Sequence, residues 1–281
     1  MKARNTQKSA AFQGEEGAFS YSAALKLLGP RAKTVPCPSF KEVFERLASG
    51  SVTHAVVPIE NTLHGSVHEN YDHLLQYDFT ISGETSVRIS HHLIAMPGVS
   101  LHSVRRAYSH PVALNQCRSF FEAHTQIEPM PFYDTAGSVK MLQQQNPPGA
   151  AAVASQGAAE IYGGKILKRN IEDDRQNFTR FFLLSEQPSP VRSANGAWKT
   201  SLVFSTPNTP GALFRAMACF ALRDLNLTKM ESRPLRGKPW EYLFYLDVLG
   251  SKDDKPMRNA IAHLSETTQF VKTLGSYRPT L

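Results

Sequence analysis

The stretch HAVVPIENT (54–62) is an unbroken apolar run that ends in a carboxylate, an amide and a hydroxyl. A short apolar run without alternation is typical of a strand buried on both faces, as in a parallel sheet. On either side of it, residues 10–13 and 180–186 predict further buried strands, and Ser39 to Glu42 is a capping box that begins a helix. This alternation predicts an α/β fold, either as one sheet or as two lobes around a cleft.

Between these strands the sequence predicts further elements. Residues 85–96 are expected to be extended, and residues 111–123 to form one helix that begins at Pro111. Asp134 and Ser155 are expected to cap two more helices.

The last third of the chain has a different pattern. Strands are predicted at 200–206, 227–233, 241–250 and 270–275, with a turn at 236–239. One helix is expected to start at Thr209-Pro210 and a second to contain Met257, Ile261 and Leu264. This β-α-β-β-α-β order predicts a ferredoxin-like domain with two helices on one face of an antiparallel sheet.

Composition limits the class of protein. With 281 residues, 41% hydrophobic and 20% charged, the chain is long enough for two globular domains, or for one large domain with an appendage. The net charge of +7 is scattered, so a nucleic-acid partner is not predicted. No membrane span or secretory signal is expected, and three widely spaced cysteines fit a reducing, cytoplasmic location.

Polar residues gather where the predicted strands end. Gly14–Ser20, Glu60–Thr62 and Ser109–His110 lie at such ends, where parallel sheets bind ligands. GEEGAF (14–19) fits either a turn or an anion site at a helix start. Arg180 enters an apolar segment, so it needs a partner, either an anionic ligand or an internal carboxylate.

A metal site is not predicted. His64, His68 and Asp72 have the spacing of one helix face, but Gly65 and Ser66 interrupt that helix near its start.

Eight short motifs together resemble the prephenate dehydratase family, including its arogenate dehydratase branch, with a C-terminal ACT domain. In chain order they are QGEEGAFS (13–20), VVPIENT (56–62), YSHPVALNQC (108–117), DTAGSV (134–139), AAVAS–AAEIYG (151–163), NFTRFF (177–182), GALF (211–214) and ESRP (231–234).

The resemblance implies a domain organisation. A two-lobed catalytic domain similar to type 2 periplasmic binding proteins is expected over 8–187, a linker over 188–198 and an ACT-like domain over 199–281. In this family the ACT domain binds phenylalanine at subunit contacts, so a homodimer or homotetramer with phenylalanine as effector is expected.

The implied reaction is the decarboxylating dehydration of prephenate to phenylpyruvate, which needs neither metal nor organic cofactor. The family motifs imply one catalytic residue, Thr179, which would bind or help protonate the departing hydroxyl. The other implied positions are Ser20, Asn61, Thr62, Ser109, Gln116 and Arg180 for substrate, Glu60, Asp134 and Phe181 as support, and Gly211, Ala212, Leu213, Glu231 and Ser232 for effector. Arg180 would either pair with a substrate carboxylate or brace its loop.

Three positions depart from the family pattern, and they concern pocket shape: Val112, His64 and Phe182. Two alternatives stay open. Arogenate, which carries an ammonium-bearing carbon in place of a ketone, is a second substrate, and a non-catalytic amino-acid or aromatic-acid sensor is a second class of function.

Overall fold

The computed structural model describes residues 8–187, 197–235 and 241–279. The chain forms two compact units, of which the first contains Met1–Tyr77 and Thr85–Leu183 and the second Asp78–Glu84 and Leu184–Leu281. Most of the predicted linker and the predicted turn at 236–239 lie outside the described residues. In the described part of the chain, no helix has the length and apolar character needed to cross a bilayer.

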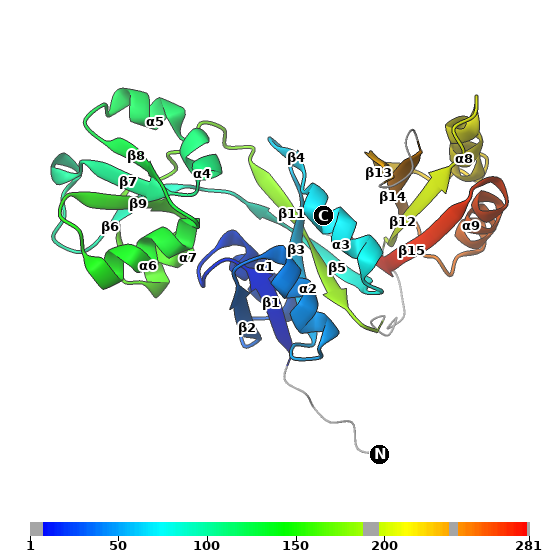
Figure 1. Cartoon of the computed structure of the whole chain (residues 1–281), viewed down its shortest axis with the longest axis horizontal. Coiled ribbons are helices and arrows are strands. Elements are labelled where there is room, and N and C mark those ends of the chain that lie inside the picture. The colour runs from blue at the N-terminus through cyan, green and yellow to red at the C-terminus, as the bar shows by residue number, and fades with distance from the viewer. Residues whose placement is uncertain (1–7, 188–196, 236–240, 280–281) are drawn as a thin grey trace, which may run out of the picture. The chain divides into compact units, whose positions relative to one another are not determined.

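The first sheet contains the strand that HAVVPIENT predicts. Its strands run in the order β2-β1-β3-β11-β5, with β4 paired to β3, and β1 is parallel to both β2 and β3 (Figure 1). Strands β5 and β11 each belong partly to both units. The elements are β1 (Ser9–Gln13), α1 (Phe19–Leu28), β2 (Lys33–Cys37), α2 (Phe40–Ala48), β3 (His54–Asn61), β4 (Gly65–Ser66), α3 (His68–Gln76), β5 (Thr80–Arg88) and β11 (Phe178–Ser185).

The second sheet has the order β10-β6-β9-β7-β8. Strand β7 is parallel to β8 and β9, whereas β6 is antiparallel to β9 and β10. The elements are β6 (His92–Ala95), a 3-10 turn (Leu101–Ser103), β7 (Arg106–Ser109), α4 (Pro111–Asn115), α5 (Arg118–Ala123), β8 (Glu128–Pro131), α6 (Thr135–Gln145), β9 (Ala150–Ala154), α7 (Gln156–Ile161) and β10 (Lys165–Lys168).

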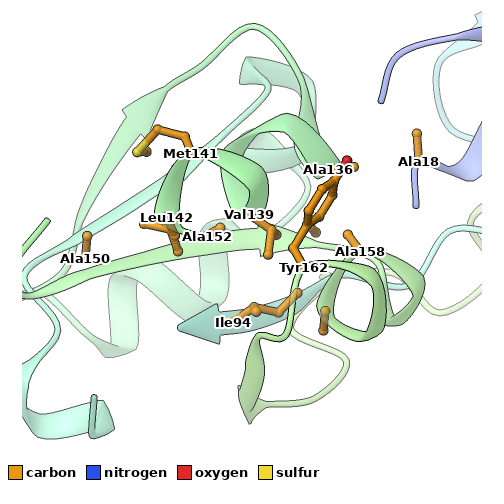
Figure 2. Packing of buried hydrophobic residues seen from close by; sticks show 12 residues of the cluster. Ala18, Ile94, Ala136, Val139, Met141, Leu142, Ala150, Ala152, Ala158 and Tyr162 are labelled. Carbon is orange, nitrogen blue, oxygen red and sulfur yellow. The ribbon is translucent and has the colours of Figure 1, made fainter. Parts of the chain in front are cut away.

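Small side chains pack the second sheet against its helices. All five residues of β9 are buried, and Ala150 and Ala152 belong to one hydrophobic cluster with Val139 and Leu142 of α6 (Figure 2). Ala18, from the loop that precedes α1, belongs to the same cluster. The predicted two-lobed α/β fold is therefore confirmed as two sheets, and residues at the start of α1 tie them together.

Two predicted elements are each divided in two. The extended segment 85–96 is the end of β5 and then β6, which lie in different sheets. The helix predicted at 111–123 is α4 followed by α5, because the carboxylate of Asp173 accepts hydrogen bonds from the backbone N–H groups of Arg118 (2.9 Å) and Ser119 (3.0 Å). A side chain from elsewhere in the chain thus begins a new helix.

The second unit has the predicted ferredoxin-like order. Its antiparallel sheet runs β13-β14-β12-β15, and α8 and α9 cover one face (Figure 1). Phe244, Leu246 and Val248 face these helices, as the alternation in the sequence predicts. The elements are β12 (Lys199–Thr206), α8 (Ala212–Ala221), β13 (Leu227–Pro234), β14 (Tyr242–Leu249), α9 (Lys255–Thr267) and β15 (Phe270–Tyr277).

Helix α8 starts two residues later than its prolyl start signal predicts. Its N-cap is Gly211, with φ of 74°, and no side chain caps it. Thr209 Oγ1 instead lies 3.5 Å from Arg215 Nη2, so the prediction of Thr209 as the cap is wrong.

Candidate active site

A pocket of about 590 Å³ is lined by strands of the first sheet and by loops and helix starts that adjoin the strands of the second sheet. It brings together six of the residues that the sequence predicts for substrate binding, catalysis or support. They are Ser20, Asn61, Gln116, Asp134, Thr179 and Phe181.

Thr179 lies at the start of β11 and is 9% exposed. Asn61 Nδ2 donates hydrogen bonds to Thr179 Oγ1 (2.9 Å) and to Asn177 Oδ1 (2.7 Å). The backbone N–H groups of Leu63 and His64 both donate to Asn61 Oδ1 at 3.0 Å, which fixes the orientation of the Asn61 amide. The Thr179 hydroxyl therefore accepts from Asn61, and its own proton remains available to a group in the pocket.

Arg180 points away from the pocket that Thr179 and Phe181 line, because successive side chains of a strand face opposite sides. Its Nη1 atom lies 3.8 Å from Glu60 Oε2, and its guanidinium carbon lies 4.9 Å from the centre of the Phe182 ring. Glu60 is thus an internal carboxylate partner of Arg180, and like Arg180 it lies outside the pocket lining.

Two predicted substrate-binding hydroxyls are used inside the protein. Thr62 Oγ1 donates to the carbonyl of Gln176 (2.8 Å) and accepts from the N–H of Phe178 (3.0 Å), so it holds the start of β11. Ser109 is fully buried and donates to the carbonyl of Val153 at 2.6 Å. Neither residue lines the pocket.

The pocket also contains a chain of side chains that the sequence did not single out together. His91 Nε2 lies 2.8 Å from Gln116 Oε1, and Gln116 Nε2 lies 3.2 Å from His64 Nδ1. Burial lowers the pKa of His91, so the ring is neutral near pH 7 and its Nε2 donates to the Gln116 oxygen. His91 gave no sequence signal, because it falls within a run that reads only as extended.

Helix N-termini surround the pocket. Helices α1, α2, α4 and α6 each place residues of their first turn or cap in its lining, among them Ser39, His110 and Asp134. None of the described residues that line this pocket is a lysine or an arginine. The helix starts therefore place the positive ends of their dipoles at the pocket.

Asp134 is the N-cap of α6 as well as a residue of the pocket lining. Its Oδ1 accepts from the N–H of Gly137 at 2.6 Å. Burial raises the pKa of this carboxyl, and the hydrogen bond from Gly137 opposes that rise.

The GEEGAF loop joins the two lobes. Glu15 accepts from the Tyr133 hydroxyl (3.2 Å) and from Lys140 Nζ (2.9 Å), and Ser155 Oγ donates to the carbonyl of Gly17 at 2.6 Å. Partial desolvation of the hydroxyl and the Glu15 carboxylate raise the pKa of Tyr133 to about 12, although 62% of the residue is exposed. The loop thus acts as a structural turn that carries an inter-lobe contact.

The spaced histidines do not share a helix face. Helix α3 begins at His68, so His64 precedes it, and the described residues contain no group of three or more acidic, histidine or cysteine side chains that could hold a metal ion.

The predicted effector residues lie in the second unit. Gly211, Ala212 and Leu213 form the cap and first turn of α8, and Glu231 and Ser232 lie on β13. Ala212 is buried and Leu213 packs on the core.

Comparisons with known proteins agree with the motifs. The family model "Prephenate dehydratase" matches residues 10–189. Arogenate dehydratase/prephenate dehydratase 2 of Arabidopsis thaliana, a chloroplastic protein, is 44% identical over 276 residues, which cover 95% of this chain and 72% of that protein.

Two solved structures resemble the whole chain. A prephenate dehydratase from Arthrobacter aurescens in complex with L-Phe is 32% identical, with a TM-score of 0.87 over 96% of this chain and 90% of that one. A protein described as a novel type of quorum-quenching acylase, GqqA, is 33% identical, with a TM-score of 0.88 over 97% of this chain and 98% of that one. Because the family model matches residues 10–189 and the Arabidopsis arogenate dehydratase/prephenate dehydratase 2 is 44% identical, the chain belongs to the prephenate dehydratase family.

Proposed function

We propose that the pocket converts prephenate to phenylpyruvate. In this elimination the bond from the ring to its carboxylate breaks, and the electron pair enters the ring. The bond from C4 to its hydroxyl then breaks, and the departing oxygen takes up one proton. Prephenate dianion and a proton thus give phenylpyruvate, carbon dioxide and water. Because the ring becomes aromatic, the protein mainly needs to assist the departure of the hydroxyl.

The orientation of Thr179 is the observation that carries this proposal. Asn61 Nδ2 donates to Thr179 Oγ1, so it cannot accept the hydroxyl proton of Thr179. That proton must therefore be donated to another acceptor. The described residues offer it none, and Thr179 lines the pocket, so a substrate hydroxyl is the natural acceptor. Thr179 would donate to the leaving oxygen as negative charge develops there, with the proton replaced from solvent.

The helix N-termini support the binding of a dianion. A substrate carboxylate at one of these helix starts would accept hydrogen bonds from backbone N–H groups instead of forming an ion pair with lysine or arginine. A carboxylate held in this way is less strongly stabilised than in water, which favours its loss as carbon dioxide. The ring would lie against apolar lining residues such as Phe19, Ile89 and Phe181.

We extend the proposal to regulation by the second unit. The ferredoxin-like order and the GALF and ESRP motifs support an ACT domain over 199–281 that follows a catalytic domain over 8–187. Phenylalanine is proposed as its effector, with support from the L-Phe complex of the Arthrobacter relative. Gly211, without a side chain, leaves the backbone of the α8 start open to a ligand.

We also propose that the protein forms a homodimer or a homotetramer, because large apolar side chains of the second unit are exposed. Phe214 and Leu222 are each 77% exposed and Met230 is 53% exposed, all within the second unit. Large apolar side chains left in water are typical of a surface that another subunit covers. Light scattering coupled to gel filtration, with and without phenylalanine, tests this state.

A cytoplasmic location stays a prediction. It is supported by Cys37, Cys117 and Cys219, which are all buried and free.

One assay separates the candidate functions. The full chain is incubated separately with prephenate, with arogenate and with an N-acylated amine, and phenylpyruvate, phenylalanine and free amine are measured. Phenylpyruvate formation from prephenate is the expected result, and added phenylalanine should lower it. Amide cleavage without dehydration would replace the proposal with acylase chemistry. Binding of an aromatic acid without turnover would indicate a sensor.

A further inference from the structure

His91 is a buried histidine of the active-site pocket to which the proposed chemistry assigns no part. It lies between β5 and β6, lines the pocket and is 2% exposed. Burial lowers its pKa, so the ring carries no charge near pH 7. A neutral imidazole has one N–H donor and one acceptor nitrogen, and a buried polar atom without a partner is costly. The contacts of the ring therefore indicate what His91 does.

The His91 ring makes one hydrogen bond, and its partner is Gln116. His91 Nε2 and Gln116 Oε1 lie 2.8 Å apart. His91 Nδ1 is buried and has no hydrogen-bond partner in the described part of the chain. Because a carboxamide oxygen can only accept, Nε2 must carry the ring proton. The single polar contact of this side chain thus serves to orient one amide.

The position of the His91 ring is fixed by its surroundings. The backbone N–H of His91 donates to Glu172 Oε2 at 2.9 Å, and the backbone carbonyl accepts from the N–H of Ile171 at 2.9 Å. Glu172 is itself held by Arg88, whose Nη2 lies 2.9 Å from its Oε1. The ring packs edge-on against Phe19, with the ring centres 5.6 Å apart and the planes at 82°. A side chain restrained in this way can hold a neighbour in one orientation.

The orientation of the Gln116 amide matters because its two ends have nearly the same size but opposite hydrogen-bonding character. Its backbone is fixed at the C-cap of α4, where its N–H donates to the carbonyls of Val112 and Ala113. With Oε1 held by His91, Nε2 lies 3.2 Å from Nδ1 of His64, another residue of the pocket lining. An amide nitrogen has two protons, so the second can be donated to a ligand. If the amide turned by 180°, the ligand would meet a carbonyl oxygen, which repels a carboxylate.

We propose that His91 is a positioning residue, which fixes the Gln116 amide so that an N–H group and not a carbonyl faces the anionic substrate. The inference rests on the proposed dehydratase function, in which the substrate is a dianion. Since the described lining of this pocket contains no lysine or arginine, neutral N–H donors must stabilise that charge, and the direction of each one matters. His91 acts through Gln116 and does not need to touch the substrate.

A double-variant cycle in the full-length protein tests this role, with kcat/KM for prephenate as the measured quantity. His91→Leu should lower kcat/KM roughly tenfold, the low end of the effect of one hydrogen bond to a charged group. Gln116→Leu should lower it at least as much. Because His91 acts through Gln116, the double variant His91→Leu/Gln116→Leu should be no worse than Gln116→Leu alone. His91→Gln, whose amide can place a donor near the position of Nε2, should recover most of the wild-type value.

His92→Leu is the matched control. His92 is the next residue along the chain, is 4% exposed and lies outside the pocket lining, and its Nδ1 accepts from the N–H of Asn170 at 3.0 Å. An effect through packing alone multiplies with the effect of Gln116→Leu. His92→Leu should therefore change kcat/KM by the same factor whether Gln116 is present or replaced. Each rate is divided by the folded fraction, which near-ultraviolet circular dichroism measures.

A second measurement detects the hydrogen bond without turnover. In nitrogen NMR spectra of histidine-labelled protein, the His91 signals are identified by their loss in His91→Leu. They should show the proton on Nε2, and Gln116→Leu should shift them. A proton on Nδ1, an unchanged kcat/KM in His91→Leu, or losses that multiply in the double variant would overturn the positioning role while the dehydratase function stands. If the wild type does not convert prephenate, the dehydratase function fails and the positioning role with it.

Discussion

Replacing Thr179 with valine tests the proposed chemistry most directly. Valine has nearly the same shape, so the change removes the hydroxyl while filling the same space. If Thr179 donates to the departing oxygen, kcat should fall by roughly 10²–10⁴, the usual effect of a positioned proton-transfer group. At about 1.4 kcal/mol per factor of ten, this corresponds to about 3–5.5 kcal/mol of lost transition-state stabilisation. Thr179→Ala should fall in the same range, and Thr179→Ser should recover most of the rate.

The same variant should cost little stability. Asn61 Nδ2 loses its acceptor at 2.9 Å but keeps Asn177 Oδ1 at 2.7 Å and the Phe178 carbonyl at 3.2 Å. We therefore expect the free energy of unfolding to fall by only about 1 kcal/mol. The assay combines initial rates of phenylpyruvate formation with denaturant unfolding of each variant.

Thr62→Val provides the contrast. It also removes a threonine hydroxyl, but one that makes two internal hydrogen bonds and lies outside the pocket lining. It should lower stability at least as much as Thr179→Val while reducing kcat far less. A Thr179→Val variant whose kcat stays within threefold of the wild type would refute the role of this hydroxyl.

Three further predictions concern the rest of the molecule. The Tyr133 pKa of about 12 lies above the ordinary value, so its contribution to stability is present below pH ~10 and is lost as the pH rises towards 12. Glu15→Gln should lower that pKa, as an absorbance titration referenced to Tyr133→Phe would show. Lys199→Met should lower the free energy of unfolding by about 3–5 kcal/mol, because it leaves Glu84 buried without the cation now 2.6 Å away. The double variant Lys199→Met/Glu84→Gln should recover part of this loss in denaturant unfolding. Equal losses in the single and the double variant would contradict the pairing. Gly211→Ala, at φ of 74°, should destabilise by about 1 kcal/mol and raise the phenylalanine concentration needed for half-inhibition, whereas an unchanged inhibition curve would remove Gly211 from the effector site.

The sequence predicted an element correctly wherever neighbouring residues alone specify that element. The strand at 54–61 and the Ser39 cap needed only neighbouring residues, and the structure confirms both. The split of the helix predicted at 111–123 could not be foreseen, because Asp173, more than fifty residues away, caps its second half. Such a contact leaves no periodic trace in the sequence.

The site divides in the same way. The motifs that predicted Asn61, Gln116 and Thr179 identified residues that the structure brings to one pocket. Motif membership could not separate Thr179 from its neighbour Arg180, or Asn61 from Thr62, because adjacent residues of one motif face opposite sides or bond to different partners. The sequence by itself determined which residue types are available and roughly where each strand ends. Only the tertiary structure decided which hydroxyls are already satisfied internally and which still have a proton to donate, because hydrogen-bond partners in this protein come from segments far apart in the chain.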